Sequence, residues 1–329
     1  MKVLITGGAG YIGSTVASAC IDAGIEVVLL DDLSTGRADF GAGRLLYLGD
    51  ISDAELLNQI ADEHPDIDLV IHCAARIVVP ESVAEPLSYY DVNVGRTVAM
   101  LRHLAVRGIR CVLFSSSAAI YRGDSGAGVD ESAPIAPGSP YANTKWIVEQ
   151  ILRDAATSGE IRAIALRYFN PIGADPQMRT GLQNPAPSHA LGKIMTSHAH
   201  GIPFTITGTD WDTRDGSGLR DYIHVWDLAR AHVAAVQRFD GIVSDDEAYV
   251  AMNVGTGNGV TVRELVAAFE RVSGEVLRVV EGARRPGDQA GAFALVGRAE
   301  AALAWKAEYS VDEGVRDALT WAEKLKTLD

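Results

Sequence analysis

Residues 3–13 read Val3-Leu4-Ile5-Thr6-Gly7-Gly8-Ala9-Gly10-Tyr11-Ile12-Gly13, and this stretch decides the fold. Its first four residues are typical of a buried strand, and glycines follow at positions 7, 10 and 13. Glycine lets the backbone turn tightly and approach a bound group, while the amides and positive dipole end of the next helix face an anion. A glycine triplet alone is typical of ordinary turns. Between a strand and a helix it predicts a site for the pyrophosphate of a dinucleotide.

Apolar, strand-like runs recur through the first half of the chain, and amphipathic helical patterns separate most of them. Their hydrophobicity is continuous rather than alternating, which indicates strands buried on both faces. Strands that alternate with helices predict an α/β fold with a Rossmann-like doubly wound parallel sheet. The expected strands are 3–6, 26–30, 45–48, 69–73, 111–115 and 162–166, and the expected helices are 53–63, 89–106 and 141–156.

The composition loosens past Gly173, where residues 175–188 contain three prolines and several polar side chains. Such a segment is typical of a long functional loop between two units. We therefore expect a dinucleotide-binding domain at 1–172 and a smaller C-terminal α/β substrate domain at 173–329. We also expect some of the later chain to return to the first domain.

Charge and cysteine content exclude several classes of protein. The 29 basic and 43 acidic residues leave a formal charge of −14, which repels nucleic acid. Cys20, Cys73 and Cys111 are odd in number and lie in apolar patterns, which indicates reduced thiols. No apolar run approaches the ~18 residues that span a bilayer, and the first strand follows Met1-Lys2 without room for a signal peptide. We expect a cytoplasmic protein without a membrane or nucleic-acid partner, and without a bound metal.

Tyr141 and Lys145 are four residues apart and therefore share one face of a helix. An ammonium beneath a phenol favours the phenolate, so we expect the pKa of Tyr141 to fall and the phenol to act as a base near neutral pH. Surface helices carry such pairs by chance. Here Ser115-Ser116-Ser117 ends an apolar strand, at the edge where doubly wound sheets bind ligands. The combination predicts an enzyme that oxidises a hydroxyl group with a nicotinamide cofactor.

The choice of cofactor depends on Asp31 and Asp32, which follow the second strand. Asp31 lies 18 residues past Gly13, where an acidic side chain accepts hydrogen bonds from the adenosine ribose and repels a 2′-phosphate. This favours NAD, although the nearby Arg37 keeps NADP open. Asp50 ends the third strand and is expected near the adenine amino group. We interpret His72 as a hydrogen-bonded structural histidine.

Four motifs then carry a resemblance to a known family: Ser115–Ser117 continued by Ala118-Ala119-Ile120-Tyr121, residues 139–145, residues 167–174 and residues 220–225. The last two read Arg-Tyr-Phe-Asn-Pro-Ile-Gly-Ala and Arg-Asp-Tyr-Ile-His-Val and are the most specific. With the glycine turn, they make the chain resemble the extended short-chain dehydrogenase/reductase superfamily and, within it, the UDP-galactose 4-epimerases. The resemblance covers nearly the whole chain. It implies an isomerase that epimerises C4 of a UDP-hexose with NAD through a 4-keto intermediate.

The resemblance also implies roles for individual residues. Ser117, Tyr141 and Lys145 would be catalytic. NAD would contact Gly7, Gly10, Tyr11, Ile12, Gly13, Asp31, Asp32, Ser34, Thr35, Gly36, Asp50, Ile51, Cys73, Ala74, Ala75, Asn93, Ser115, Tyr141, Lys145, Tyr168 and Phe169. The UDP-sugar would contact Ser117, Tyr141, Asn170, Leu191, Phe204, Thr205, Ile206, Arg220, Arg285, Asp288 and Ala292. The family's Asn- or His-Leu pair before a proline is replaced at 188–193, so the residue that contacts uridine there stays open.

Several alternatives remain at this level. Related dehydratases carry an Asp-Glu pair where this chain has Ala118-Ala119, which argues against water elimination. Some relatives carry a tyrosine where this chain has Ala292, so UDP-GlcNAc and UDP-GalNAc are further candidate substrates. A UDP-glucuronate 4-epimerase, a decarboxylase or oxidoreductase acting on a nucleotide sugar, and an NAD-binding regulator stay open. By resemblance, the helices at 89–106 and 141–156 would form a homodimer interface.

Overall fold

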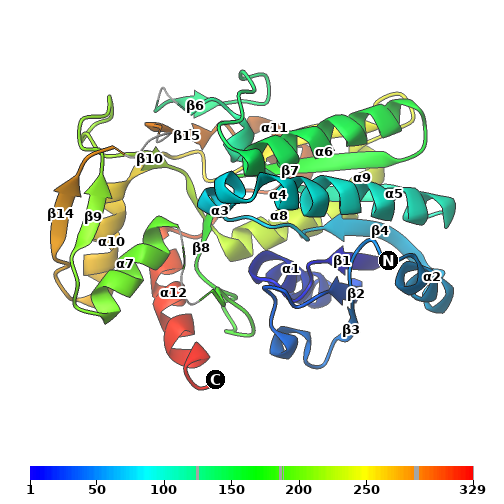
Figure 1. Ribbon diagram of the computed structural model, residues 1–329, viewed down its shortest axis with the longest axis horizontal. Coiled ribbons are helices and arrows are strands. Elements are labelled where there is room, and N and C mark those ends of the chain that lie inside the picture. Colours follow the sequence, from blue (N-terminus) through cyan, green and yellow to red (C-terminus); the bar gives the residue numbers. More distant parts are fainter. Residues whose placement is uncertain (124–125, 185–186, 188, 285–288, 329) are drawn as a thin grey trace.

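A seven-stranded parallel sheet forms the centre of the computed structural model, which describes residues 1–123, 126–184, 187, 189–284 and 289–328 (Figure 1). Its strand order is β12-β7-β5-β4-β1-β2-β3, and each neighbouring pair is parallel. The six strands expected from the sequence are all present, and β12 joins them from the second half of the chain. The strands are β1 (Lys2–Thr6), β2 (Glu26–Asp31), β3 (Leu45–Leu48), β4 (Ile67–His72), β5 (Cys111–Ser117), β7 (Arg162–Tyr168) and β12 (Tyr249–Val254).

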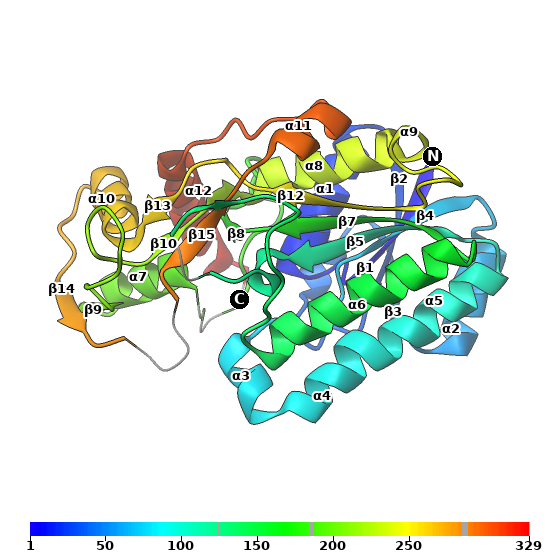
Figure 2. The same ribbon diagram turned by 90° about the horizontal axis from the view of Figure 1, so that it is seen from above.

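Helices cover both faces of this sheet, as the alternation of strands and helices predicts (Figure 2). One face packs against α1 (Tyr11–Asp22), α8 (Val225–Gln237), α9 (Phe239–Ile242) and α11 (Gly297–Leu303). The other face packs against α2 (Ala54–Glu63), α5 (Arg96–Val106) and α6 (Pro140–Thr157). The strand interiors are buried in both layers, with Leu4 and Ile5 fully inaccessible to solvent. The expected fold class is confirmed.

The helix predicted at 89–106 is longer and less regular than its pattern indicates. It begins with α4 (Pro86–Tyr90), widens into a π-helical turn (Asp91–Gly95) and continues as α5. A short helix α3 (Val79–Ala84) and a 3₁₀ turn (Ala38–Gly41) complete the first half before residue 118. π-helical turns are rare and lie frequently at functional sites. This turn contains Asn93, which is buried.

Apart from β12, α8, α9 and α11, which belong to the central sheet and its layers, the second half forms short strands and three further helices. β8 (Asn170–Ile172) pairs with β11 (Tyr222–His224), and β9 (Phe204–Thr207) pairs with β14 (Val279–Gly282). A second sheet has the order β13-β10-β15-β6, from β13 (Val260–Thr261), β10 (Leu219–Arg220), β15 (Gly291–Ala294) and β6 (Gly128–Val129). The larger hydrophobic core of this half joins β8, β9 and β11 to α7 (Ala190–Ala199), α10 (Val262–Ser273) and α12 (Val311–Leu325). Helix α10 begins with a capping box formed by Thr261 and Glu264.

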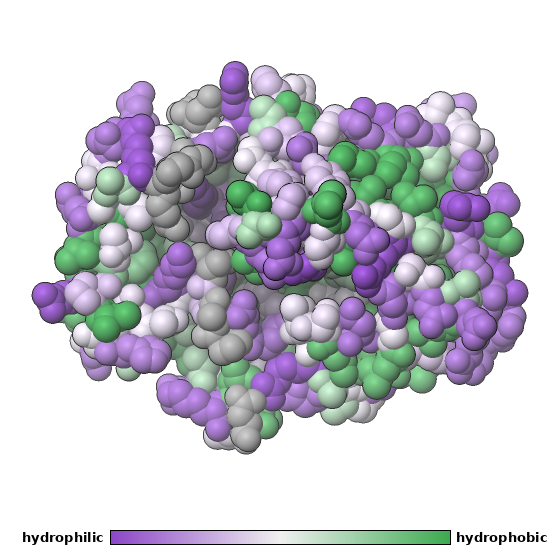
Figure 3. All heavy atoms as spheres, viewed as in Figure 1, coloured by the Kyte–Doolittle hydropathy of each residue, from purple (hydrophilic) through white to green (hydrophobic). Residues whose placement is uncertain are grey.

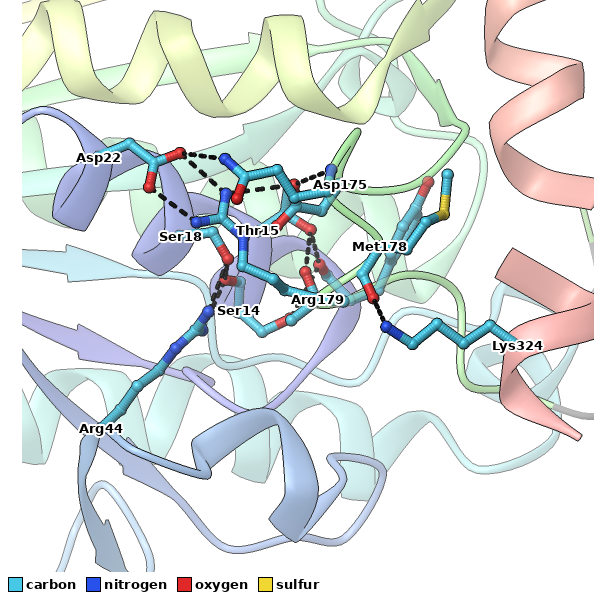
Figure 4. A network of polar contacts seen from close by, with 12 residues as sticks. Ser14, Thr15, Ser18, Asp22, Arg44, Asp175, Met178, Arg179 and Lys324 are labelled. Atoms are coloured by element: carbon cyan, nitrogen blue, oxygen red, sulfur yellow. Dashed lines mark hydrogen bonds and ion pairs between the residues drawn. The ribbon is translucent and has the colours of Figure 1, made fainter. Parts of the chain in front are cut away.

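The loop of residues 173–183 ties the two halves together (Figure 4). Arg179 of this loop forms hydrogen bonds of 2.7 and 2.9 Å with Asp22 at the end of α1, and it also pairs with the fully buried Asp175. On the other side, the Nζ atom of Lys324 in α12 donates to the carbonyl of Met178 at 2.6 Å. The first helix and the last helix are therefore joined through one loop.

Within the described ranges, no helix has the length and apolar character needed to cross a membrane. The division of the chain at residues 172 and 173 stays a prediction.

Candidate active site

The carboxyl ends of the parallel strands bring the expected site residues to one edge of the sheet. Thr6 at the end of β1 is paired with Leu30 of β2 and with His72 of β4. Ser117 at the end of β5 is paired with Tyr168 of β7. Because these registers align the strand ends, the glycine turn, the acidic pair, Cys73–Ala75 and the serine run all begin at this edge.

The glycine turn has the close packing that a dinucleotide cradle requires. Gly7 has a φ of 69°, and a Cβ atom there would lie 2.7 Å from the amide nitrogen of Ala74. A Cβ atom on Gly13 would lie 2.1 Å from the carbonyl oxygen of Gly7. Gly10 is the N-cap residue of helix α1, so no side chain caps the helix, and as far as the described chain shows its first turn has no acidic residue. Its first amides are therefore available to an anion such as a pyrophosphate, and these residues fit NAD.

Asp31 lies at the end of β2 beside this turn. The amide of Ala9 donates to its Oδ2 atom at 2.9 Å, and the amide of Leu33 donates to Oδ1 at 2.8 Å. Burial raises the pKa of Asp31, while these two amides lower it. A Cβ atom on Gly36 would lie 2.7 Å from Oδ1, so glycine is needed next to the carboxylate. Among the described residues, each oxygen of Asp31 accepts one such hydrogen bond, which leaves it able to accept another from a ribose hydroxyl.

The other acidic residues at this edge organise the loops around them. Asp32 accepts hydrogen bonds from the amide and hydroxyl of Ser34 at 2.9 and 2.6 Å. Asp50 accepts from Ser52 and pairs with Arg96 of α5, and these contacts lower its pKa against the effect of burial. The carbonyl of Thr35 accepts from Gln183 at 2.8 Å, which joins this loop to residues 173–183. Ile51 is buried in the core next to α2.

Ser117, Tyr141 and Lys145 converge at the same edge from β5 and α6. Each is nearly buried, with 8%, 8% and 3% of its surface exposed. Helix α6 begins with a cap in which Ser139 accepts from the amide of Ala142 at 3.2 Å. The hydroxyl of Ser117 lies near the phenol of Tyr141 and, as a hydrogen-bonding neighbour, lowers the pKa of that phenol. The strand-serine, helix-tyrosine, lysine arrangement expected from the sequence is thus assembled in space.

The expected lowering of the pKa of Tyr141 is wrong for the described chain. Burial raises the pKa of this phenol, and the hydrogen bond from Ser117 offsets only part of that effect. Burial likewise lowers the pKa of Lys145 to about 8, against the opposing influence of Cys73 and Glu149. Lys145 donates from Nζ to the carbonyl of Ser115 at 2.8 Å and lies 4.8 Å from the ring centroid of Phe114. Desolvation therefore outweighs the favourable effect of the ammonium on the phenolate.

Asn93 and His72 connect the loop and strand of β4 to helices α6 and α5 by hydrogen bonds. Asn93 accepts from the amide of Arg76 at 2.8 Å and donates to Arg76 O at 2.9 Å and to the hydroxyl of Thr144 at 3.0 Å. It is thus a link between the loop after β4 and the helix that carries Tyr141. His72 is a structural histidine, as interpreted from the sequence: its ring bonds Thr6 at 2.7 Å and Thr97 at 2.9 Å, and burial lowers its pKa to about 3.

Among the expected substrate residues of the second half, Arg220 and Ala292 are direct cross-strand neighbours in β10 and β15. Arg220 is half-buried and donates to the carbonyls of Leu219 and Ala290 at 2.6 and 3.1 Å. Asn170 is held through its amide by the carbonyl of Asp221 at 3.0 Å. Phe169, the residue before it, is 8% exposed and packs near Ala292.

The remaining expected substrate residues are less simply placed. The side chains of Leu191, Phe204 and Ile206 lie in the core of the second half, so only their main chain is available to a nucleotide. Thr205 is exposed between Phe204 and Ile206. Arg285 and Asp288 lie outside the residues that the structure describes.

Two charged residues behind the site received no role from the analysis of motifs, although one of them, Arg167, begins the motif of residues 167–174. Glu149 and Arg167 form an ion pair in which neither side chain has more than 3% of its surface exposed. The sequence signal that could have found Glu149 is its spacing: Tyr141, Lys145 and Glu149 follow one another every four residues along one helix face.

Comparison with known proteins agrees with this geometry. Residues 3–255 match the NAD dependent epimerase/dehydratase family. A UDP-glucose 4-epimerase of Azospirillum brasilense is 43% identical over 99% of this chain and 93% of its own length. The structure of a UDP-glucose-4-epimerase from Stenotrophomonas maltophila, with bound NAD and formylated UDP-arabinopyranose, is 36% identical and superposes over 100% of both chains with a TM-score of 0.94. That of Bifidobacterium longum, in complex with NAD⁺ and UDP, is 33% identical over 98% of both chains with a TM-score of 0.90.

The expected cofactor, NAD, agrees with the family and with these neighbours. The likeness extends over the Rossmann-like sheet, the glycine turn and the second half alike. By its sequence and its fold, the chain belongs to the UDP-glucose 4-epimerase group of the NAD-dependent epimerase/dehydratase family.

Proposed function

We propose that this protein is an isomerase that interconverts UDP-galactose and UDP-glucose by epimerisation at C4, with NAD as its cofactor. The observation that carries the proposal is the convergence of Ser117, Tyr141 and Lys145 beside the glycine turn. A dehydratase acid pair is absent from the corresponding position, where Ala118 and Ala119 form a short apolar turn after Ser117. Without that acid pair, elimination of water has no proton donor and acceptor at this position, and epimerisation is the reaction that remains.

The roles of the side chains follow from their contacts. Tyr141 takes the proton of the sugar 4-hydroxyl, and Ser117 holds the phenol oxygen by a hydrogen bond. Lys145 supplies a buried positive charge one helical turn from Tyr141, which favours the phenolate. Bound NAD supplies a reversible acceptor for the hydride at C4. After the sugar has turned its other face, C4 of the 4-keto sugar regains the hydride and its oxygen regains the proton from Tyr141, so the reaction has no net redox change.

Arg220 is the residue we assign to the diphosphate, because its guanidinium is oriented by two carbonyls and lies next to Ala292. Holding the diphosphate while the sugar turns keeps the ketone in the site. Arg285 and Asp288 keep the substrate roles implied by the family resemblance.

The direct test incubates purified protein with UDP-galactose without added cofactor and separates the products. UDP-glucose as the product supports the proposal. Release of carbon dioxide, NADH or a keto sugar would assign the protein to the decarboxylases or oxidoreductases, and binding of NAD without turnover would make it a regulator. Turnover of UDP-glucuronate in preference to UDP-galactose would place it among the glucuronate 4-epimerases.

A second proposal concerns the width of the sugar pocket. Ala292 is paired with Arg220 across the strands, and its methyl group is smaller than the tyrosine that some relatives carry, so we propose UDP-GlcNAc and UDP-GalNAc as further substrates. Ala292→Tyr should remove activity on the N-acetylated sugars by at least 10-fold more than activity on UDP-galactose. Equal losses for both sugars would refute this assignment.

We also propose a homodimer formed by α5 and α6. The two helices lie side by side on one face of the sheet (Figure 2), and hydrophobic side chains gather over α6 on the molecular surface (Figure 3). Ile147 and Ile151 of α6 are partly exposed, and Val106 of α5 is 88% exposed. Light scattering should give twice the monomer mass for the native protein and the monomer mass for an Ile147→Glu/Ile151→Glu variant. A monomeric native protein would contradict the interface.

We assign the protein to the cytoplasm. The thiols of Cys20, Cys73 and Cys111 are free, which suits a reducing compartment. Cell fractionation with an antibody against the chain tests this assignment.

A further inference from the structure

A buried acid, Glu149, lies beside the catalytic groups, and the reaction described above does not use it. Glu149 is on α6, one turn beyond Lys145 and two turns beyond Tyr141, and none of its surface is exposed. Its carboxylate faces Arg167 of β7: the Nε atom donates to both oxygens at 3.0 and 3.1 Å, and Nη2 donates to Oε2 at 2.6 Å. An ion pair this deeply buried needs hydrogen bonds on every side to offset its desolvation.

Those hydrogen bonds reach three neighbouring strands of the sheet. The hydroxyl of Ser116 in β5 and the hydroxyl of Tyr249 in β12 both donate to the carboxylate of Glu149, the latter at 2.9 Å. From Arg167 the network continues through Nη1 to the hydroxyl of Tyr121 at 2.8 Å. The hydroxyl of Tyr121 then donates to Oδ1 of Asn253 in β12 at 2.7 Å.

The contact to Ser116 places the network next to the reacting groups. Ser116 stands between Ser115, whose carbonyl accepts from Lys145, and Ser117, whose hydroxyl lies near Tyr141. The end of β5 is therefore held at the two successive residues Ser115 and Ser116 by groups on α6. Rigid support of this kind keeps catalytic side chains within the narrow range of geometry that proton transfer needs.

The network also sets the charge around the phenol. Lys145 and Arg167 are two buried cations, and Glu149 is the anion that lies close to both. A buried cation keeps its charge only when an opposite charge offsets the loss of hydration. The carboxylate of Glu149 is bound to Arg167 directly and acts on Lys145 through space.

We propose that Glu149 is a positioning residue of the 4-epimerase reaction, which holds the end of β5 against α6 and keeps Lys145 positively charged while Tyr141 exchanges its proton. This inference rests on the proposed function, and it adds a residue that does not contact the substrate. The expected consequence is a pH profile whose alkaline limb depends on Glu149.

The other groups that face Lys145 are compatible with this assignment. From β4, the thiol of Cys73 also raises the pKa of Lys145, and His72 is held neutral by burial. From β5, Phe114 and the Ser115 carbonyl contact the ammonium. From β7, Tyr168 has its pKa raised by burial and stays neutral. Glu149, which is paired with Arg167, supplies the carboxylate among the groups around Lys145.

The test compares the NAD-loaded native protein with Glu149→Gln, which keeps the shape and removes the charge. Loss of this opposite charge removes one of the groups that raise the pKa of the Lys145 ammonium. The alkaline limb of kcat for UDP-galactose should therefore move to lower pH. KM should change less than about threefold, because Glu149 does not contact the substrate.

Two further variants separate the charge from the packing. Tyr249→Phe removes one hydrogen bond to the same carboxylate and should leave the alkaline limb where it is. Glu149→Gln/Arg167→Met removes the anion together with its partner cation, so that Arg167 is not left unpaired if the single variant folds poorly, and the limb should move less than in Glu149→Gln because the two lost charges act on Lys145 with opposite signs. A uniform loss of kcat at all pH values in all three variants would overturn the proposal and leave Glu149 a purely structural residue.

A readout that needs no turnover keeps the inference separate from the proposed function. An NMR titration of the Cε resonance of Lys145, assigned by its absence in Lys145→Met, follows the ionisation of that ammonium alone. Its midpoint should fall in Glu149→Gln, because the carboxylate that favours the charged form is gone. An unchanged midpoint would refute the inference even in an active enzyme, and a lowered midpoint in a protein without epimerase activity would refute only the proposed reaction.

Discussion

Lys145 should make the folded protein less stable at neutral pH than an apolar residue at the same place. Its folded pKa of about 8 lies below the ordinary value of 10.5 because the ammonium is buried. At 1.36 kcal/mol for each pKa unit, this difference corresponds to about 3 kcal/mol of unfavourable free energy when the lysine is charged in both states. Lys145→Met removes that contribution but leaves the Ser115 carbonyl without its donor, which costs about 1 to 3 kcal/mol.

The pH dependence of this difference isolates the buried charge. For a lysine with a lowered folded pKa, the unfavourable contribution is complete below pH 8 and vanishes above pH 10.5. The free energy of unfolding of the native protein should therefore rise relative to that of Lys145→Met by about 1 kcal/mol between pH 7 and pH 9. The lost hydrogen bond to Ser115 is the same at both pH values and cancels in this comparison.

Urea unfolding of nucleotide-free protein at pH 7 and pH 9, followed by tryptophan fluorescence, measures the effect. Nucleotide must be removed because a bound ligand adds stability of its own. The control is Lys306→Met, at an exposed lysine, for which the difference from the native protein should not depend on pH. A difference between the native protein and Lys145→Met that stays constant, or changes in the opposite direction, would show that Lys145 is not a buried cation.

Three further predictions concern the site itself. Tyr141→Phe should lower kcat for UDP-galactose by about 10²- to 10⁴-fold while NAD content is retained, and a loss of only a few-fold would contradict its role as the base. Gly13→Ala should abolish NAD binding in a fluorescence titration, because the new Cβ would lie 2.1 Å from Gly7 O, whereas Gly241→Ala, where nothing lies within 4 Å, should bind normally. Asp31→Asn should lower the preference for NAD over NADP by at least about 10-fold in competition binding, since one lost charge interaction of 1.4 kcal/mol corresponds to that factor, and an unchanged preference would remove Asp31 from the ribose site.

Much of the site is local in the sequence and was predictable for that reason. A glycine turn, an acidic strand end and a Tyr-x-x-x-Lys helix each carry their geometry in residues that are neighbours in the chain. Parallel strands then bring their carboxyl ends to one edge whatever the loops between them do. The expected strands and the fold class were confirmed for this reason.

Other features depend on residues far apart in the chain. Strand β12 pairs with β7 although more than 80 residues separate them, and the network of Glu149, Arg167, Tyr249 and Asn253 exists only because of that pairing. The direction of the pKa of Tyr141 was mispredicted for the same reason. A helical spacing shows that an ammonium is near, but the degree of burial is set by packing between α6 and the sheet.

Periodicity and glycine placement by themselves determined that this chain forms a doubly wound sheet with a dinucleotide cradle, whereas the epimerase-like set of side chains was implied by the resemblance of its motifs to a known family. Such patterns act through local backbone geometry and through which faces can be buried, and both are properties of short stretches. Only the tertiary structure decided which ionisable side chains are buried and therefore desolvated. Electrostatic energies depend on the surroundings of a group in three dimensions, so the neutral phenol of Tyr141, the weakened ammonium of Lys145 and the buried Glu149–Arg167 pair follow from the folded arrangement.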